Sequence, residues 1–182
     1  MKKLTVSRQV ATKIKQGKSL LEKQDFDSLP ALDQAVQLLS GDGQSLGVGY
    51  LSEQNKGIGW FISQELVDFD QNFFQERFKK AKQYRRSYYA DASTTAFRLF
   101  NQEGDGFGGF TIDLYGEFVV FSWYNPFVFQ IKETILTAFQ EVFPEVRGGY
   151  EKIRFKGLDY ESAHLYGEEA PQEFLILENG VS

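Results

Sequence analysis

The sequence contains no cysteine, and its 182 residues include only one histidine, one methionine and four prolines. Without cysteine the chain has no disulfide framework, no thiolate zinc or iron–sulfur site and no cysteine nucleophile. His164 has no second histidine and no serine motif with which to form a zinc site or a catalytic triad. We therefore interpret His164 as a surface residue, and we expect neither a metal site nor a stand-alone hydrolase.

The sequence also has no apolar run long enough to span a bilayer, and residues 1–21 lack the apolar stretch of a signal peptide. In contrast, 42% of the residues are hydrophobic and 16% are aromatic, which is ample for a packed core. We expect a soluble, cytoplasmic protein of one or two small domains that does not contact a membrane.

The formal net charge is −5, but the charges are unevenly distributed. Residues 1–23 hold seven basic residues and one acidic residue, and residues 77–98 hold the same numbers. Two basic segments can form a local positive surface on an acidic protein, and such a surface favours contact with nucleic acid phosphates. The candidate RNA-binding residues are Lys13, Lys15, Lys18, Lys79, Lys80, Lys82, Arg85 and Arg86.

The first part of the chain reads as a short helix followed by short strands. The apolar spacing predicts a helix over residues 7–17 that stops at Gly17. The turn sequence SGDG at residues 40–43 predicts a hairpin between residues 36 and 51. Five glycines within residues 43–59 suit a small, tightly curved barrel, because glycine relieves crowding at bends and bulges.

Residues 70–90 form the clearest predicted helix, with Asp70 or Asn72 as its N-terminal cap. Its basic residues fall largely outside an apolar stripe that would face the core. The stripe consists of Phe69, Phe73, Phe74, Phe78, Ala81, Tyr84 and Tyr88.

The last part of the chain alternates between strand-like and helical segments. Strands are predicted over residues 95–102 and twice within residues 107–124, with Phe110, Ile112 and Leu114 on one face. Asn125 and Pro126 open a second helix, which ends before Pro144. Further strands are predicted over residues 149–155 and 173–180. The order of strand, strand, strand, helix, strand, strand indicates an α+β domain.

The glycine-rich stretch at residues 104–109 suggests a phosphate-binding loop, but its context favours a structural turn. It lies between two strands, lacks a following lysine and hydroxyl residue, and is flanked by acidic groups. Three nearby acids, Glu103, Asp105 and Asp113, could form a metal site, yet acids beside a turn are more often solvated or capping groups.

Four aromatic residues, Trp60, Phe61, Trp123 and Tyr124, are candidates for stacking on RNA bases. Because most of the 18 phenylalanines must build the core, a core position is favoured for each of these four as well. The basic face of residues 77–86 is the stronger indication of an RNA partner.

Three segments, residues 94–121, 143–152 and 165–180, resemble the middle region of the large-subunit ribosomal RNA methyltransferase I family. Members of that family use S-adenosylmethionine to methylate carbon 5 of a cytosine in 23S rRNA. The residues that match the family pattern are Arg98, Leu99, Glu103, Asp105, Gly106, Gly109, Asp113, Tyr115, Gly116, Gly167, Glu168 and Glu178 to Gly180.

The resemblance implies three parts: a PUA-like RNA-binding β-barrel at residues 1–69, a linking helix at 70–92 and an α+β middle domain at 93–182. Residues 39–58 resemble the glycine-rich hairpin of the barrel. In the family a catalytic domain with the cofactor site and a cysteine nucleophile follows this region. We therefore expect a truncated chain with no catalytic, cofactor-binding or metal-binding residues, and with S-adenosylmethionine used only by the full-length family.

The expected function is that of the RNA-binding, substrate-positioning part of a ribosomal RNA methyltransferase, with 23S rRNA as the partner. Whether the chain by itself counts as an enzyme stays open at this point. The alternative is a protein-interaction or dimerisation module, in which exposed aromatic residues bury against a partner or in a homodimer.

Overall fold

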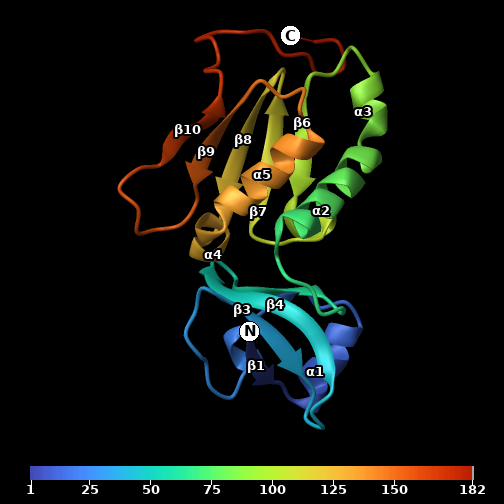
Figure 1. The fold of residues 1–182 in the computed structure, drawn as a ribbon, viewed down its shortest axis with the longest axis vertical. Coiled ribbons are helices and arrows are strands. Elements are labelled where there is room, and N and C mark those ends of the chain that lie inside the picture. The colour runs from blue at the N-terminus through green and yellow to red at the C-terminus, as the bar shows by residue number, and fades with distance from the viewer. Residues whose placement is uncertain (182) are drawn as a thin grey trace.

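The computed structural model describes residues 1–181, which form two mixed α+β units arranged one above the other along the long axis (Figure 1). Each unit is built on one five-stranded sheet that contains both parallel and antiparallel strand pairs. The α+β prediction is therefore confirmed. Among residues 1–181 the structure contains no helix with the length and apolar character needed to cross a membrane.

The N-terminal sheet has the strand order β1-β3-β4-β5-β2, in which β1 and β3 are parallel and the other pairs are antiparallel. The predicted N-terminal helix and the hairpin of β3 and β4 are confirmed. The elements of this unit are β1 (Lys2–Thr5), α1 (Arg8–Lys15), β2 (Leu20–Leu21), the 3₁₀ turn η1 (Lys23–Asp25), β3 (Gln34–Leu39), β4 (Ser45–Gln54) and β5 (Gly57–Ser63).

Two glycines allow β4 and β5 to approach each other closely. A Cβ atom at Gly49 would overlap the carbonyl oxygen of Trp60, and one at Gly59 would overlap that of Tyr50. Any larger residue at either position would push the strands apart, which explains the glycine-rich composition of this segment.

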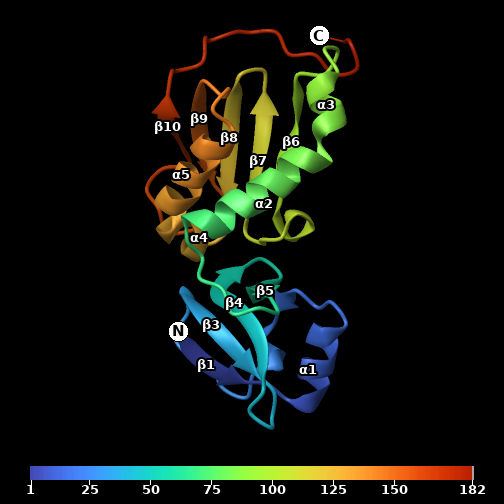
Figure 2. The same cartoon turned by 45° about the vertical axis from the view of Figure 1, so that its right-hand side comes forward.

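The second sheet has the strand order β10-β9-β8-β7-β6, with β8 and β9 parallel. The helices α2 and α5 pack side by side across one face of this sheet (Figures 1 and 2). The elements of this unit are α2 (Gln71–Tyr84), α3 (Arg86–Ala90), β6 (Ala96–Asn101), the 3₁₀ turn η2 (Gln102–Asp105), β7 (Phe110–Tyr115), β8 (Phe118–Trp123), α4 (Pro126–Gln130), α5 (Lys132–Val142), β9 (Gly148–Ile153) and β10 (Ser162–Gly167).

The helix prediction for residues 70–90 is correct in place but wrong in continuity. The backbone of Arg85 leaves the helical conformation at φ −101° and ψ 15°, and this divides the segment into α2 and α3. Ile131 divides the helix after Pro126 into α4 and α5 in the same way. After the break α3 has no buried residue, whereas α5 continues to bury apolar side chains.

The strand predicted over residues 173–180 is wrong, and the fifth strand of this sheet is β10. Residues 173–180 instead cross the end of the sheet (Figure 1), where the amide of Thr95 donates a 2.6 Å hydrogen bond to the carbonyl of Leu177. The ring of Phe174 packs on Phe118, 5.7 Å away between centroids. The segment thus contacts the end of the sheet without pairing as a strand, and Phe174 and Leu175 remain exposed.

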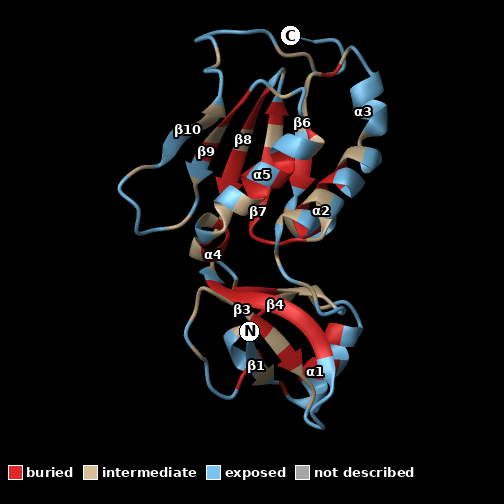
Figure 3. Ribbon diagram, viewed as in Figure 1, coloured by how far each residue is buried: buried red, intermediate tan, exposed pale blue. Residues whose placement is uncertain are grey.

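The core of the second unit lies between the sheet and the helices α2 and α5 (Figure 3). It is unusually aromatic. Phe78 from α2 has ring neighbours on the sheet and on α5, among them Phe100 at 5.4 Å and Phe139 at 5.6 Å between centroids. Edge-to-face packing of this kind contributes beyond the area buried, by about 0.5–1.5 kcal/mol per pair.

Tyr50 connects the two units. This residue lies on β4 of the first sheet, but its side chain is fully buried in the core of the second unit. Its hydroxyl donates a 2.6 Å hydrogen bond to the carbonyl of Gly108 and accepts one of 2.9 Å from Asn125. The ring stacks on Phe127 at 4.3 Å between centroids. Burial strongly raises the pKa of Tyr50, so the phenol stays protonated and remains a donor.

We predict that Tyr50→Phe lowers the free energy of unfolding by about 1–3 kcal/mol, because the buried Gly108 carbonyl and the Asn125 amide each lose a partner. Urea unfolding followed by circular dichroism measures this change. Tyr84→Phe is the matched control, since Tyr84 is highly exposed. Equal stability of the two variants would contradict the role assigned to the Tyr50 hydroxyl.

Candidate nucleic-acid interface

The helix α2 displays basic residues because its other side is held against the sheet. The carboxylate of Asp70 caps the helix by accepting a 2.9 Å hydrogen bond from the amide of Phe73. Phe74, Phe78 and Ala81 are buried on the sheet side. The lysines and arginines of residues 77–86 consequently lie toward or at the surface.

Five of the candidate RNA-binding residues lie on or between α2 and α3. Of these five, Lys79, Lys80 and Arg86 are exposed. Lys79 lies 3.2 Å from Glu76, and both side chains are mostly exposed, so this ion pair holds Lys79 only weakly. Lys79 and Arg86 line a groove of about 640 Å³ between α2 and α5. Cations on the rim of a groove can contact a phosphodiester chain without first breaking a strong internal ion pair.

Lys82 and Arg85 are bound within the protein. Lys82 donates to the carbonyl of Val142 at 2.9 Å, at the C-terminal end of α5, and lies 3.2 Å from Glu145. Arg85 forms a two-pronged ion pair with Asp105, with N···O distances of 2.9 and 2.7 Å. Its Nε also donates to the carbonyl of Arg98. These two residues fasten α2 to the rest of the unit.

Sequence reasoning did not identify Asp105 as the partner of Arg85. The carboxylate of Asp105 also accepts a 2.7 Å hydrogen bond from the amide of Asn101, so it organises the turn η2. No local pattern joins the two residues, which are twenty positions apart. Only the packing of α2 beside β6 and η2 brings them together.

The N-terminal helix α1 supplies the other basic residues. Ser7 caps the helix by accepting a hydrogen bond from the amide of Val10, and Lys13 and Lys15 lie exposed in the last turn. Lys18 is largely enclosed and lies 2.9 Å from Glu22 and 3.2 Å from Asp25. Lys18 therefore joins the end of α1 to η1.

Three hollows adjoin one another across the two units, and together they are called the track. The first lies beside α1, the second beside α2 and the third between α3 and β6. The first and second share Glu103 and Gly106 as lining residues, and the second and third share Tyr84, Gly104 and Asp105. In Figure 1 the helices α1 and α3 stand on the same side of the molecule.

The glycine-rich stretch at residues 104–109 packs against protein side chains. The side chain of Arg77 covers Gly106, the ring of Trp60 covers Gly108, and the hydroxyl of Tyr50 lies against Gly109. Gly106 and Gly109 have positive φ angles of 93° and 113°, which glycine adopts without strain. This stretch therefore fits a structural turn between the two units.

Two of the three acids near this turn are paired with arginines. Asp105 is paired with Arg85, and Asp113 lies 2.9 Å from Arg98. Among the described residues, 1–181, the structure brings together no group of three or more side chains able to hold a metal ion. His164 lies exposed on β10, with its ring edge-on to Tyr150.

The aromatic residues divide differently from the sequence prediction. Trp60 and Trp123 are buried, in agreement with the favoured core interpretation. Tyr84 and Tyr88, which the sequence places on the buried stripe of the helix, are 79% and 50% exposed. Tyr84 is the last residue of α2, before the break at Arg85, and Tyr88 lies on α3, which has no buried residue. The change from phenylalanine to tyrosine along the stripe was the one signal of this exposure in the sequence.

A comparison with protein families finds that residues 4–64 match the family model described as a PUA-like domain. The N-terminal unit is therefore a PUA-like domain. This finding agrees with the resemblance seen in the glycine-rich hairpin of the sequence.

The chain is also similar to ribosomal RNA methyltransferases. It is 34% identical, over its full length, to a Bacillus subtilis protein provisionally named ribosomal RNA large subunit methyltransferase YwbD, of which it covers 48%. It is 32% identical to the ribosomal RNA large subunit methyltransferase I of Vibrio parahaemolyticus, with 84% of this chain and 39% of that protein covered. The chain thus spans about half or less of the length of the curated relatives that it matches.

Among solved structures, the chain is similar to a Streptococcus mutans protein provisionally described as a SAM-dependent methyltransferase. The identity is 50% and the TM-score is 0.93, with 99% of this chain and 47% of that chain covered. A second structure, with the same identity and TM-score, is provisionally described as a methyltransferase complexed with SAH. Homology to RNA methyltransferases thus extends over both units of the chain.

We predict that Gly108→Ala destabilises the protein by about 1–3 kcal/mol, because the added methyl group would overlap the buried ring of Trp60. Gly104→Ala is the matched control, since a Cβ atom there meets nothing closer than 3.8 Å. Thermal unfolding of both variants measures the difference. A Gly108→Ala protein as stable as the control would mean that the turn is not fixed against the PUA-like domain.

Proposed function

We propose that this chain binds ribosomal RNA and positions it for methylation, as the substrate-binding part of a ribosomal RNA methyltransferase. The observation that carries the proposal is the row of adjoining hollows across both units, whose lining includes Lys18, Arg77 and Lys80. Further exposed cations lie on the helices α1, α2 and α3. Similarity to ribosomal RNA methyltransferases and the PUA-like domain support RNA as the partner. In this proposal the substrate is 23S rRNA, which the chain binds in the cytoplasm.

Within this proposal the eight basic residues have two roles. Lys13, Lys15, Lys79, Lys80 and Arg86 contact RNA phosphates from exposed positions. Lys18, Lys82 and Arg85 hold the surface in shape through their ion pairs with acidic side chains. Because Tyr50 fixes one unit on the other, both sets of exposed cations act on the same RNA molecule.

We propose further that residues 1–182 contribute RNA binding and not methyl transfer. Under this proposal, S-adenosylmethionine is the methyl donor of the full-length relatives. Methylation at carbon 5 of cytosine requires a thiolate that attacks the ring, and this sequence contains no cysteine.

We predict that replacing Lys79, Lys80 and Arg86 by glutamine weakens binding to a 23S rRNA fragment about 10- to 100-fold at low salt. Each lost phosphate contact also lowers the slope of log affinity against log salt by about 0.7–0.9. Fluorescence anisotropy over a series of salt concentrations measures both quantities.

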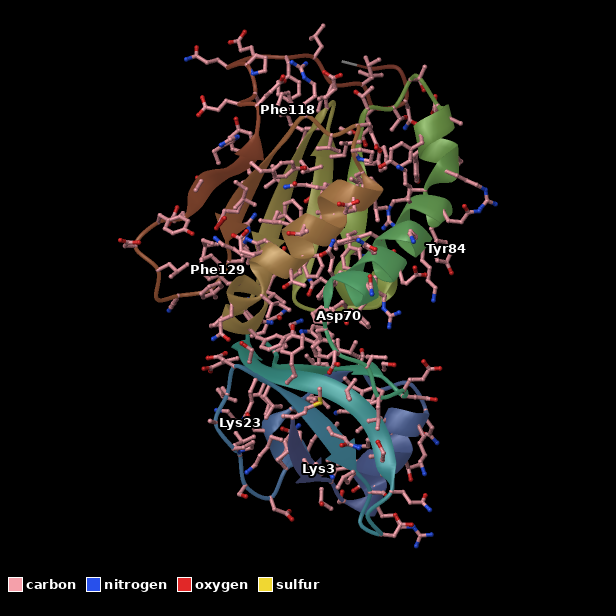
Figure 4. All side chains as sticks on the ribbon, viewed as in Figure 1. Lys3, Lys23, Asp70, Tyr84, Phe118 and Phe129 are labelled. Atoms are coloured by element: carbon pink, nitrogen blue, oxygen red, sulfur yellow. The ribbon has the colours of Figure 1, made fainter. Side chains whose placement is uncertain are left out.

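The matched control replaces Lys2, Lys3 and Lys23 by glutamine. These three residues are also exposed, and their replacement removes the same charge. Figure 4 shows Lys3 and Lys23 on the PUA-like domain, away from Tyr84. An equal loss of affinity in both triple variants would contradict the assignment of the RNA-binding surface to α2 and α3. It would show that the affinity depends only on the net charge of the protein.

We predict that S-adenosylmethionine gives no saturable heat of binding when it is titrated into this chain. The similar protein whose solved structure is described as a complex with SAH is the positive control. One-to-one binding to residues 1–182 would overturn the assignment of the chain to substrate binding alone.

A protein-interaction or dimerisation module is the competing hypothesis. Sedimentation velocity of the free chain, set beside RNA binding, separates the two functions. A stable homodimer that fails to bind the rRNA fragment would favour the competing hypothesis.

A further inference from the structure

The most exposed aromatic rings of the second unit lie together at the end of α2 and on α3. Tyr84 is 79% exposed and Tyr88 is 50% exposed. The ring of Tyr88 stacks on Phe97 at 5.2 Å with an angle of 24° between the ring planes. One face of Tyr88 is thus supported by the protein while the ring remains half exposed. Figure 4 shows Tyr84 on the outer side of α2.

Tyr84 stands where two of the hollows meet. It lines the hollow of about 310 Å³ beside Arg77 and Lys80, and also the hollow of about 630 Å³ that contains Tyr88 and Phe97. A planar ligand in either hollow can therefore reach a tyrosine ring. Hollows of these sizes fall in the range that small ligands occupy.

The polar and charged side chains around Tyr84 and Tyr88 suit a nucleic acid, which has an anionic backbone and neutral bases. Lys80 lies one helical turn before Tyr84, on the same side of α2. Of the carboxylates in the two hollows, Asp105 is neutralised by Arg85, while Glu103 and Glu178 lie at exposed positions. Asn101 adds an amide, which can hydrogen-bond to the edge of a base.

We propose that Tyr84 and Tyr88 are a stacking platform for unpaired RNA bases, with Lys80 beside them on the phosphate backbone. This inference rests on the proposed RNA-binding function and names the kind of RNA that is bound. Base stacking on exposed aromatic rings requires bases that are not already stacked in a duplex. The track therefore receives a single-stranded segment, such as the loop or opened strand that a base-modifying enzyme must reach.

A protein partner fits this surface less well. An interface core is usually depleted of charge, whereas here the rings alternate along the helix with Lys80, Arg85 and Arg86. The hollow around Tyr88 also contains Arg98, Asn101 and Asp105, so the rings lie in a polar setting. Alternating cations and aromatic rings are the pattern of single-stranded nucleic acid sites.

The test uses the full chain with a short fluorescent single-stranded RNA and with the duplex formed from the same strand. Tyr84→Leu and Tyr88→Leu should each weaken single-strand binding about 5- to 100-fold, because a leucine keeps apolar bulk but offers no aromatic face. Tyr84→Phe should bind within about twofold of the unchanged protein. Because both positions are exposed, these variants are expected to fold, and circular dichroism verifies this.

The salt dependence separates stacking from charge. Loss of a tyrosine should lower affinity without changing the slope of log affinity against log salt, whereas Lys80→Gln should lower the slope. Duplex binding should respond to Lys80→Gln and not to Tyr84→Leu.

Three outcomes would overturn the platform. If the unchanged protein binds neither RNA, the proposed function itself fails. If it binds RNA but Tyr84→Leu and Tyr88→Leu bind the single strand equally well, the platform fails while the proposed function stands. If sedimentation shows a dimer that dissociates on Tyr84→Ala, the two tyrosines form a protein interface instead.

Discussion

The buried hydroxyl of Tyr50 is the interaction on which the arrangement of the molecule depends. A phenol taken out of water must find hydrogen-bond partners, and those of Tyr50 lie on Gly108 and Asn125 in the other unit. The same contact fixes the glycine-rich turn, since Gly109 must stay small to admit the hydroxyl. The two sheets are therefore held in one orientation, and the surfaces of α1 and α2 form parts of a single track.

The basic residues of α2 and α3 have two roles, because some form internal ion pairs and others lie exposed at the surface. The ion pair of Arg85 with Asp105 is mostly enclosed, and breaking one partner would leave a poorly solvated charge behind. The pair of Lys18 with Asp25 is enclosed in the same way, whereas the pair of Lys82 with Glu145 is exposed to solvent. Lys79, Lys80 and Arg86 lie on the outer side of the same helix pair and are exposed to solvent. One charged run in the sequence thus contains both the cations that hold the fold together and the cations that are free to contact a ligand.

The large aromatic content of the chain serves two ends. Most of the phenylalanines pack edge-to-face between the second sheet and α2 and α5, where they give the core its volume. Tyr84 at the end of α2 and Tyr88 on α3 lie outside this core, on either side of the helix break at Arg85. The ion pair of Arg85 with Asp105 lies in the hollow that these two exposed rings line.

The sequence by itself determined the α+β class, the helices of the basic segments and most of the strands, because apolar periodicity, caps and turn residues act over a few positions. It also placed the basic residues on two helices. It did not determine which cations are exposed, since the partner of Arg85 is twenty residues away. It also misplaced the last strand, because a short run of apolar residues is typical of a strand whether or not it pairs with a sheet. Tertiary structure alone decided the joint at Tyr50, the exposure of Tyr84 and the adjacency of the three hollows, since each depends on contacts between segments distant in the chain.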